Sequence, residues 1–390
     1  MTIRRNPPYA YSALVAAVIL AAWSSAARSD SFSDWFAKNM IDAQDGKFDV
    51  SNYLASATGF FPVPIIITEP AVGAGLGFAV AYFHPPKPVD AEVHPHRGPP
   101  SITVGFGAKT ENGTNFYGVG HLGVWNEDHV RYLGAIARAD ANLRFYPNLG
   151  QQALLDEGIK FNVLGEFLFQ QLKVRLRESN WWLGMDYLYI DAETNFLIQD
   201  QPINLPPPLG AFEQGGVGAV VEFDSRDSTF TPSRGLRAKL QYRNYADTWG
   251  SDFDFGHVHG SLNYFVPVGE FSTLGLRLDG EAVNGDVPFF SFPFVNLRGI
   301  PAMRYQGQEV VTTEAEFLWG LTPRWTLNFF AGAGRTTAVD SFAASNDTVV
   351  AGGLGFRYRI ARKLRMQVGI DVARGPEETA FYLTVGSAWF

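Results

Sequence analysis

The 390-residue sequence contains no cysteine, and only 18% of its residues are charged. The lack of cysteine excludes a disulfide framework and any metal site built on thiolates. The net charge of −8 argues against general nucleic-acid binding, which needs a basic surface. No stretch reaches the about 20 consecutive apolar residues that a membrane-spanning helix requires. The sequence therefore excludes several classes of protein before any motif is considered.

Glycine and aromatic residues are abundant where charge is scarce. The chain has 40 glycines and 14% aromatic residues, a combination that is unusual for a soluble enzyme of this size. It suits β-strands that face lipid on one side. We therefore ask whether the residues alternate as such strands require.

The first residues have the pattern of an export signal. Arg4 and Arg5 precede the apolar run Ala13–Trp23, and Ser25–Ala27 offers small residues for cleavage. A membrane-anchoring helix is the alternative, but the apolar run is short for that role. We predict a signal peptide over residues 1–27, a short periplasmic lead-in over 28–55 and a barrel over 56–390, with export to the bacterial outer membrane.

Several long segments alternate with a period of two. In Gly235–Tyr245 one face is apolar and the other carries Arg237, Lys239 and Arg243, and Leu274–Glu281 and Leu364–Val372 follow the same rule. In Arg131–Tyr146 the odd positions are apolar and the even positions include charged residues. A soluble sandwich would bury the apolar faces, whereas a membrane barrel would turn them to lipid and the charged faces to a polar lumen. The export signal, the strand lengths and the aromatic content favour the barrel.

Counting such segments predicts an all-β fold, a 16-stranded antiparallel transmembrane barrel, in which an even number of strands permits closure. The predicted strands are 61–68, 74–83, 101–109, 114–125, 130–146, 159–176, 181–194, 216–223, 235–245, 253–266, 273–283, 310–321, 326–335, 348–359, 364–372 and 379–390.

Connection lengths test this prediction. Short turns and longer loops should alternate around a barrel, and most predicted connections follow that rule, including a long loop over Asn195–Gly215. The Pro- and His-rich segment 84–100 breaks it, because it is long on the side where turns should be short. Its role is open: it is either a flexible periplasmic insert or a slip in the strand count.

The connection Ser291–Gln308 is far longer than a hairpin turn, and loops of that length are usually functional or disordered. Within it, Leu297–Ala302 (Leu-Arg-Gly-Ile-Pro-Ala) resembles the signature of the sixth extracellular loop of the Omp85 superfamily of outer-membrane barrels. The resemblance covers most of the mature chain and is best over 216–390. It implies a barrel of the BamA/TamA type, related to bacterial surface antigens, with this loop folded into the lumen.

The resemblance also implies a lock in the lumen. It places Arg298 and Gly299 inside the barrel, where the arginine pairs with carboxylates on the following strands, and here Glu314 and Glu316 share one face of 310–321. The sequence departs from the family at Gly332, where an acidic residue is expected, so the lock rests on Glu316 alone or is weaker. Gly353, Gly355 and Arg357 resemble the family's next strand, Gly-x-Gly-x-Arg.

Two further motifs resemble the family. Asp224, Arg226, Asp227, Pro232 and Gly235 match its turn motif, which we expect to be structural because ion pairs can brace the turn while proline and glycine set its backbone. The terminal aromatic Phe390 resembles an assembly signal.

Two other sequence patterns give little support for a binding site. The glycines of 73–77 lack the lysine of a phosphate-binding loop, and His84, His94 and His96 lie in a Pro-rich segment without rigid geometry. We therefore predict no enzymatic activity, no metal and no cofactor.

The resemblance implies a role in inserting or translocating outer-membrane proteins. There is no room for a periplasmic POTRA domain between residues 28 and 55. The expected partners are outer-membrane lipids, client proteins and periplasmic chaperones, with no nucleic acid. A passive porin-like channel is the alternative, and an outer-membrane lipid hydrolase is a third, less favoured reading. The client, the oligomeric state and the choice between insertion, translocation and conduction stay open at this stage.

Overall fold

A computed structural model describes residues 32–56, 59–84, 101–146, 158–198, 201–204, 210–338 and 346–389. The predicted signal peptide, most of segment 84–100, and Phe390 lie outside these ranges. The chain divides into two compact units between residues 56 and 57. In the first unit the structure describes two short helices, α2 (Phe32–Met40) and α3 (Ser51–Ser56). No helix in the described ranges is long and apolar enough to cross a bilayer.

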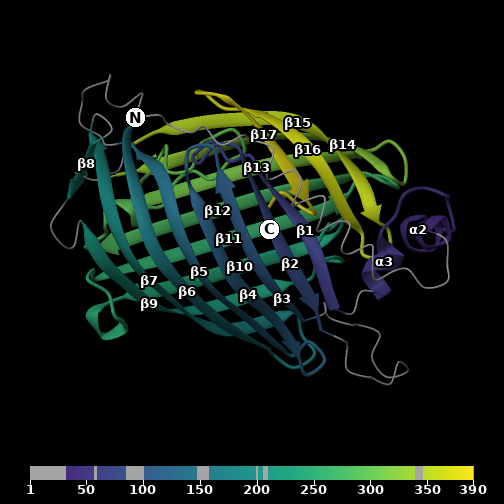
Figure 1. The fold of residues 1–390 in the computed structure, drawn as a ribbon, viewed down its shortest axis with the longest axis horizontal. Helices are drawn as coiled ribbons and strands as arrows, with labels where there is room; N and C mark the ends of the chain where they lie inside the picture. Colours follow the sequence, from purple (N-terminus) through teal and green to yellow (C-terminus); the bar gives the residue numbers. More distant parts are fainter. Residues whose placement is uncertain are drawn as a thin grey trace, which may run out of the picture. The chain divides into compact units, whose positions relative to one another are not determined.

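The second unit is built from strands (Figure 1). They are β1 (Gly59–Ile67), β2 (Gly75–Phe83), β3 (Ile102–Thr110), β4 (Asn115–Trp125), β5 (Val130–Phe145), β6 (Ile159–Arg175), β7 (Trp181–Ile198), β8 (Gln201–Asn204), β9 (Ala211–Asp224), β10 (Gly235–Tyr245), β11 (Phe255–Pro267), β12 (Thr273–Gly285), β13 (Glu309–Gly320), β14 (Trp325–Thr337), β15 (Thr348–Ala361), β16 (Met366–Arg374) and β17 (Thr379–Val385). Two 3₁₀ turns, η1 (Asp247–Trp249) and η2 (Phe289–Ser291), lie in loops.

Each wall strand pairs antiparallel with its neighbours in sequence, from β1–β2 through to β16–β17. The four-residue β8 pairs only with the end of β7, and β7 pairs directly with β9. Sixteen strands therefore form the wall of a nearly closed barrel, which confirms the predicted fold class and strand number. Where both edge strands are described, β1 and β17 approach each other without a hydrogen-bonded ladder.

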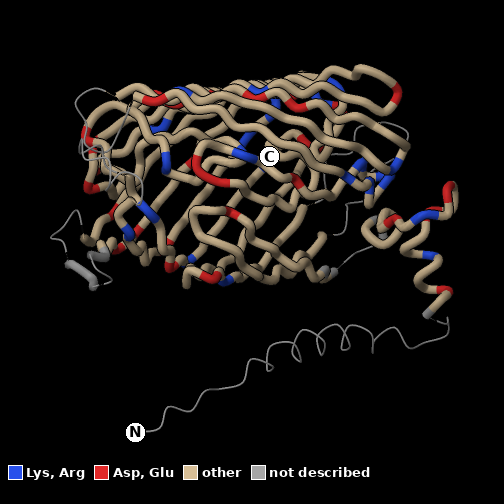
Figure 2. The backbone as a smooth tube through the Cα atoms, turned by 90° about the horizontal axis from the view of Figure 1, so that it is seen from above, with Lys and Arg blue, Asp and Glu red and all other residues tan. Residues whose placement is uncertain are grey.

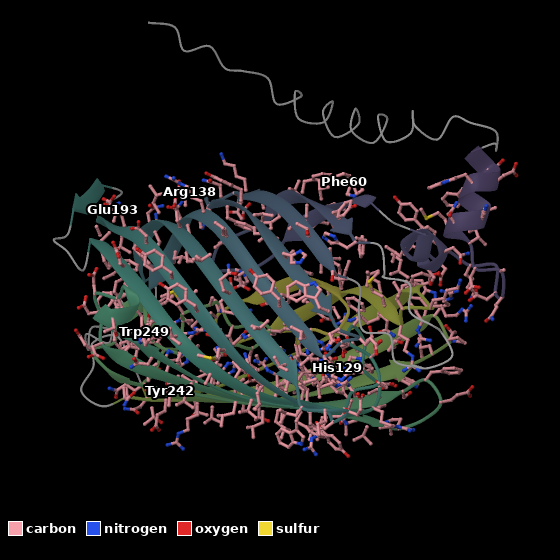
Figure 3. The ribbon with its side chains drawn as sticks, turned by 90° about the horizontal axis from the view of Figure 1, so that it is seen from below. Phe60, His129, Arg138, Glu193, Tyr242 and Trp249 are labelled. Carbon is pink, nitrogen blue, oxygen red and sulfur yellow. The ribbon has the colours of Figure 1, made fainter. Side chains whose placement is uncertain are left out.

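The two faces of the wall differ in chemistry. On one face large apolar side chains are exposed, among them Leu240 and Leu278. The other face carries ion pairs that reach past a neighbouring strand, as Lys173 of β6 does to Glu222 of β9. Side chains meet in this way only on the concave side of a wall, so the polar face is the inner face. Figure 3 shows Tyr242 of β10 on the outer side, and Figure 2 shows how much of the wall is uncharged.

The predicted polarity is confirmed in β10, β12 and β16 but is wrong in β5. There the odd, apolar positions face inward, ending at the buried Phe145, while Ile136 is exposed on the outer face and Arg138 pairs outside with Glu166. The length of β5 and the packing of its inner face explain this reversed polarity. β5 has 16 residues, more than the about 9–11 that cross a bilayer, so outward charges can lie beyond the hydrocarbon. The inner face of β5 packs against aromatic loop residues.

Two predicted boundaries are also wrong. The loop predicted over 195–215 is shorter, because β7 continues to Ile198 and β9 begins at Ala211. The last strand ends at Val385 because Gly386 takes a left-handed backbone with φ of 79°. Trp389 then packs against Phe265 of β11, with ring centroids 5.6 Å apart, instead of continuing the wall.

Candidate functional site

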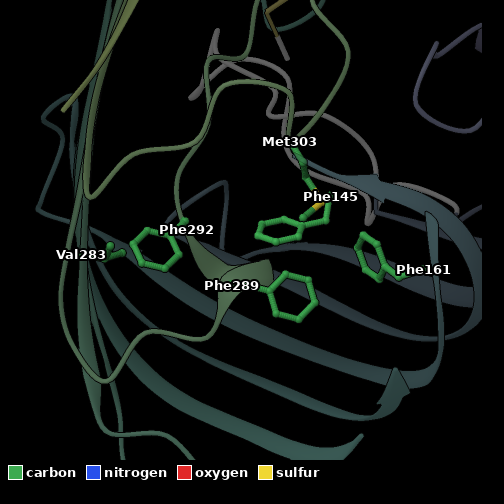
Figure 4. Close-up of a cluster of buried hydrophobic side chains, with 6 residues drawn as sticks. All are labelled: Phe145, Phe161, Val283, Phe289, Phe292 and Met303. Carbon is green, nitrogen blue, oxygen red and sulfur yellow. The ribbon is translucent and has the colours of Figure 1, made fainter. Parts of the chain in front are cut away.

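The segment between β12 and β13, residues 286–308, is anchored first by aromatic rings (Figure 4). Phe289 of η2 contacts Phe145, Phe161 and Phe196, with centroid distances of 4.9, 5.4 and 5.4 Å. These three partners come from the inner faces of β5, β6 and β7. Burying such rings stabilises the loop by removing them from water, and the pair of Phe289 with Phe161 adds an edge-to-face contact. One end of the loop therefore rests on the wall formed by β5–β7.

The guanidinium of Arg298 binds a different part of the wall. Its Nε donates to Glu314 Oε1 at 2.9 Å and its Nη1 to Asp371 Oδ2 at 2.8 Å, while Nη2 lies 2.7 Å from Glu316 Oε2. Its Cζ lies 3.5 Å from the ring centroid of Phe330. Burial alone would lower the pKa of Arg298, but three carboxylates, Glu316 first, outweigh it and raise the pKa, so the side chain stays charged.

Asp371 of β16 is the partner that the sequence analysis missed. Arg357 of β15 holds it bidentately, with Nη–Oδ distances of 2.6 and 2.7 Å, and both side chains are almost fully buried. Asn328 donates to both Asp371 and Glu316. We call Arg298, Glu314, Glu316, Arg357 and Asp371 the Arg298 cluster. The sequence did contain a signal for this partner: the Gly-x-Gly-x-Arg motif is followed by an aspartate on the polar face of the next strand.

Gly332 of β14 stands where the resemblance led us to expect an acidic residue, and there is little room for a side chain at this position. A Cβ at Gly332 would lie 2.7 Å from both Leu297 Cδ2 and the carbonyl oxygen of Thr313, so a side chain here would require these neighbours to shift. At Gly334 a Cβ would lie 2.2 Å from Val295 Cγ1. Val295 and Leu297 are buried with Ile300 in a second apolar cluster against β13 and β15. The two glycines thus leave room for loop side chains, and Asp371 provides the extra carboxylate from another strand.

The backbone conformation at position 299 requires a glycine. Its φ is 92°, and an added Cβ would lie 3.0 Å from the backbone of Arg374 and Gly375. Its N–H donates to Tyr382 Oη of β17 at 2.9 Å. Met303, a non-glycine residue with φ of 62°, is also buried in this loop. Such conformations persist only where the surroundings hold them, which indicates a firmly packed loop.

The chain's C-terminal residues reach the same cluster. Trp389 Nε1 donates to Glu314 Oε2 at 2.9 Å, and Ser387 N donates to Phe230 O at 2.7 Å. Glu314 is therefore shared between the long loop and the tail. The predicted assembly signal, Phe390, lies outside the described residues, so its role stays a prediction.

The predicted turn motif forms one compact unit at the end of the barrel that carries the short turns. Asp224 binds Arg226 bidentately at 2.8 Å on each arm. Asp227 accepts hydrogen bonds from the residues after Pro232, and Gly235 has φ of 108°. Burial raises the pKa of Asp227, but these hydrogen bonds outweigh it and hold the pKa below its ordinary value. These contacts match a bracing role, which we retain as a prediction.

A second inner-face cluster was not anticipated. Glu222 of β9 accepts from Lys173 at 3.1 Å and from Arg237 at 3.2 Å, both on Oε2, and it is 2% exposed. Lys239 lies opposite Glu222 in the β9–β10 register. Of these four side chains, three are cationic and one is anionic. This carboxylate therefore offsets the charge of neighbouring cations on β6 and β10.

The close approach at Gly334 gives a direct test of loop packing. We expect Gly334→Val to destabilise the barrel by about 1–3 kcal/mol, because the new side chain occupies the space of Val295. Val295→Ala in the same chain should recover part of the loss. Gly280→Val on β12, where no atom lies within 4 Å of the added Cβ, is the matched control. Equal heat-modifiability midpoints on SDS gels for both single variants would contradict the packing described above.

Comparison with solved structures finds the same architecture. The chain is similar to BamA from Haemophilus ducreyi lacking POTRA domains 1–3, with a TM-score of 0.54 and 10% identity over 90% of this chain and 81% of that one. It is also similar to CdiB from Acinetobacter baumannii, with a TM-score of 0.56 and 9% identity, and to CdiB from Escherichia coli, with 0.55 and 10%. The two CdiB matches include 84% and 83% of this chain. They include only 59% and 61% of the CdiB chains. The sequence matches no protein-family model and no curated protein.

The protein is thus a 16-stranded antiparallel β-barrel of the kind found in the bacterial outer membrane. More particularly, its barrel has the fold seen in BamA and CdiB, which is the fold that the resemblance of Leu297–Ala302 implied.

Proposed function

We propose that this barrel assists the insertion or translocation of outer-membrane polypeptides, with residues 286–308 folded into its lumen as a brace. The observation that carries the proposal is the Arg298 cluster. One loop contacts β5–β7 through Phe289 and β13–β16 through Arg298. A short segment can touch such distant parts of a barrel wall most readily from inside. Arg298, Gly299, Glu314 and Glu316 then form the lumen lock.

A braced lumen favours a route along the wall over a route through the pore. The unlinked edges of β1 and β17 offer backbone donors and acceptors to an incoming strand, as exposed sheet edges do in β-augmentation. The C-terminal residues after β17 turn away from the wall and leave this edge short. The mechanism we propose is physical, and it requires lipids, client polypeptides and the chaperones that deliver them, but no catalytic group or cofactor.

Absence of cysteine allows a clean test. We expect a cysteine pair that joins β1 to β17 when oxidised to abolish insertion of a client barrel into liposomes, because the edges can no longer accept a strand. Positions on the facing edges would be screened for efficient crosslinking. Reductant should restore activity in the same sample.

The control is a cysteine pair at Val258 and Ala282, which are register partners within the β11–β12 ladder. Oxidising that pair should leave insertion unchanged. Full activity with the β1–β17 crosslink closed would overturn the proposal. Steady, large single-barrel conductance in planar bilayers would support the passive channel instead.

A further inference from the structure

An open groove of about 700 Å³ lies where the outer faces of β5–β7 and β9 meet the loop at residues 248–250. The outward side chains that line it are mostly apolar or aromatic: Tyr132, Leu172, Met185, Tyr187, Val217 and Trp249. Met185 and Leu172 are 64% and 46% exposed, so their apolar atoms are open to the surroundings of the barrel. The groove lies on the opposite face of the wall from the Arg298 cluster.

The loop over the groove is held in place by specific contacts. Tyr187 Oη donates to the carbonyl oxygen of Trp249 at 3.1 Å, and Trp249 Nε1 donates to Asn244 Oδ1 at 3.2 Å. A Cβ on Gly215 would lie 1.8 Å from that same carbonyl oxygen, so only glycine lets the loop rest directly on β9. Trp249 is labelled in Figure 3 at the end of the barrel that also carries Glu193. The groove is therefore a fixed part of the fold.

The charges near the groove point away from it. Asp186 is among its lining residues, but its carboxylate is turned inward, where it accepts from Arg243 and Gln241. On the outer side, the hydroxyl of Tyr132 donates to the side-chain oxygen of Gln170. A concavity whose lining is mainly apolar and aromatic, with its one carboxylate turned inward, suits an apolar ligand better than a charged one.

We propose that this groove binds the hydrocarbon chain of a membrane lipid. It is continuous with the exposed apolar side chains of the outer face, which meets hydrocarbon in a membrane barrel. A bound chain would fill the concavity below Trp249, and the aromatic rings of Tyr187 and Trp249 would lie along it, as such rings do at membrane interfaces. The groove thus offers a lipid chain a defined position on the outer face, under a tryptophan that the loop holds in place.

Native mass spectrometry of the delipidated barrel, titrated with dioleoylphosphatidylethanolamine in detergent, tests this site. We expect one lipid to be retained more tightly than any other. Met185→Trp should weaken that retention by roughly tenfold, because losing about two methylene contacts suffices for that factor. Val217→Phe fills the same groove from β9 and provides a second variant if the first folds poorly. Leu276→Trp, on the outer face of β12 and outside the groove, should leave retention unchanged.

Two results would overturn the proposal. One is equal lipid retention by the wild-type chain, both groove variants and the Leu276 control, with unaltered heat-modifiability showing that all are folded. The other concerns a photoreactive benzophenone residue placed at position 185 in cells. It should form lipid adducts, and a discrete protein adduct in their place would show that a polypeptide occupies the groove.

Discussion

Arg298→Ala is expected to lower the heat and SDS resistance of the barrel more than any other single change in the loop. The substitution leaves Glu314, Glu316 and Asp371 buried close together with Arg357 as the remaining member of the cluster. Breaking a buried ion-pair network by removing one side costs about 3–5 kcal/mol, because the stranded charges keep their desolvation penalty. The midpoint of the heat-modifiability transition on SDS gels measures the effect.

Two variants separate charge, geometry and general damage to the loop. Arg298→Lys keeps the charge but loses the planar fork that reaches three carboxylates, so we expect an intermediate loss. Arg304→Ala removes the other arginine of the loop, whose ion pair with Glu377 is longer, at 3.4 Å, and less buried than the ion pairs of Arg298, so it should cost less than Arg298→Ala. If Arg298→Ala proved as mild as Arg304→Ala, the cluster would not hold the loop.

Glu222→Gln should produce the second large loss of stability. Lys173 and Arg237 would lose the carboxylate that they share, and Lys239 would lose the anion that lies opposite it. Because Glu222 is almost fully buried, we expect about 3–5 kcal/mol of destabilisation, measured by the same gel transition or by urea unfolding in liposomes.

The matched control changes the same residue type on the outer face. Glu166 pairs with Arg138 at 3.2 Å, but both side chains are largely exposed, so Glu166→Gln should cost less than about 1 kcal/mol. Adding Lys239→Gln to Glu222→Gln should recover part of the loss by removing one of the uncompensated cations. A double variant as unstable as Glu222→Gln alone would show that charge balance is not the cause.

Much of this fold could be predicted because each strand of a barrel wall alternates between apolar and polar residues, a pattern that is visible within a few neighbouring residues. All sixteen wall strands were placed, and the loop carrying Arg298 was identified by its length and by the residues around it. The resemblance of Leu297–Ala302 implied that Arg298 pairs with carboxylates on the following strands, and alternation placed Glu314 and Glu316 on one face of the next strand. The sequence also excluded spanning helices, because no apolar run is long enough.

Other features depend on residues far apart in the chain. Alternation divides β5 into two faces but does not say which face is inside. The apolar face that carries Phe145 points inward because Phe289 packs on it. Asp371 joins Arg298 only because β13–β16 lie side by side, and Trp389 reaches Glu314 only because the chain leaves the wall at Gly386. The sequence by itself determined the strands, their two faces and the central arginine. Which face meets the lumen, and which carboxylates surround that arginine, were decided by the curvature and closure of the wall, because these bring together residues that no local pattern connects.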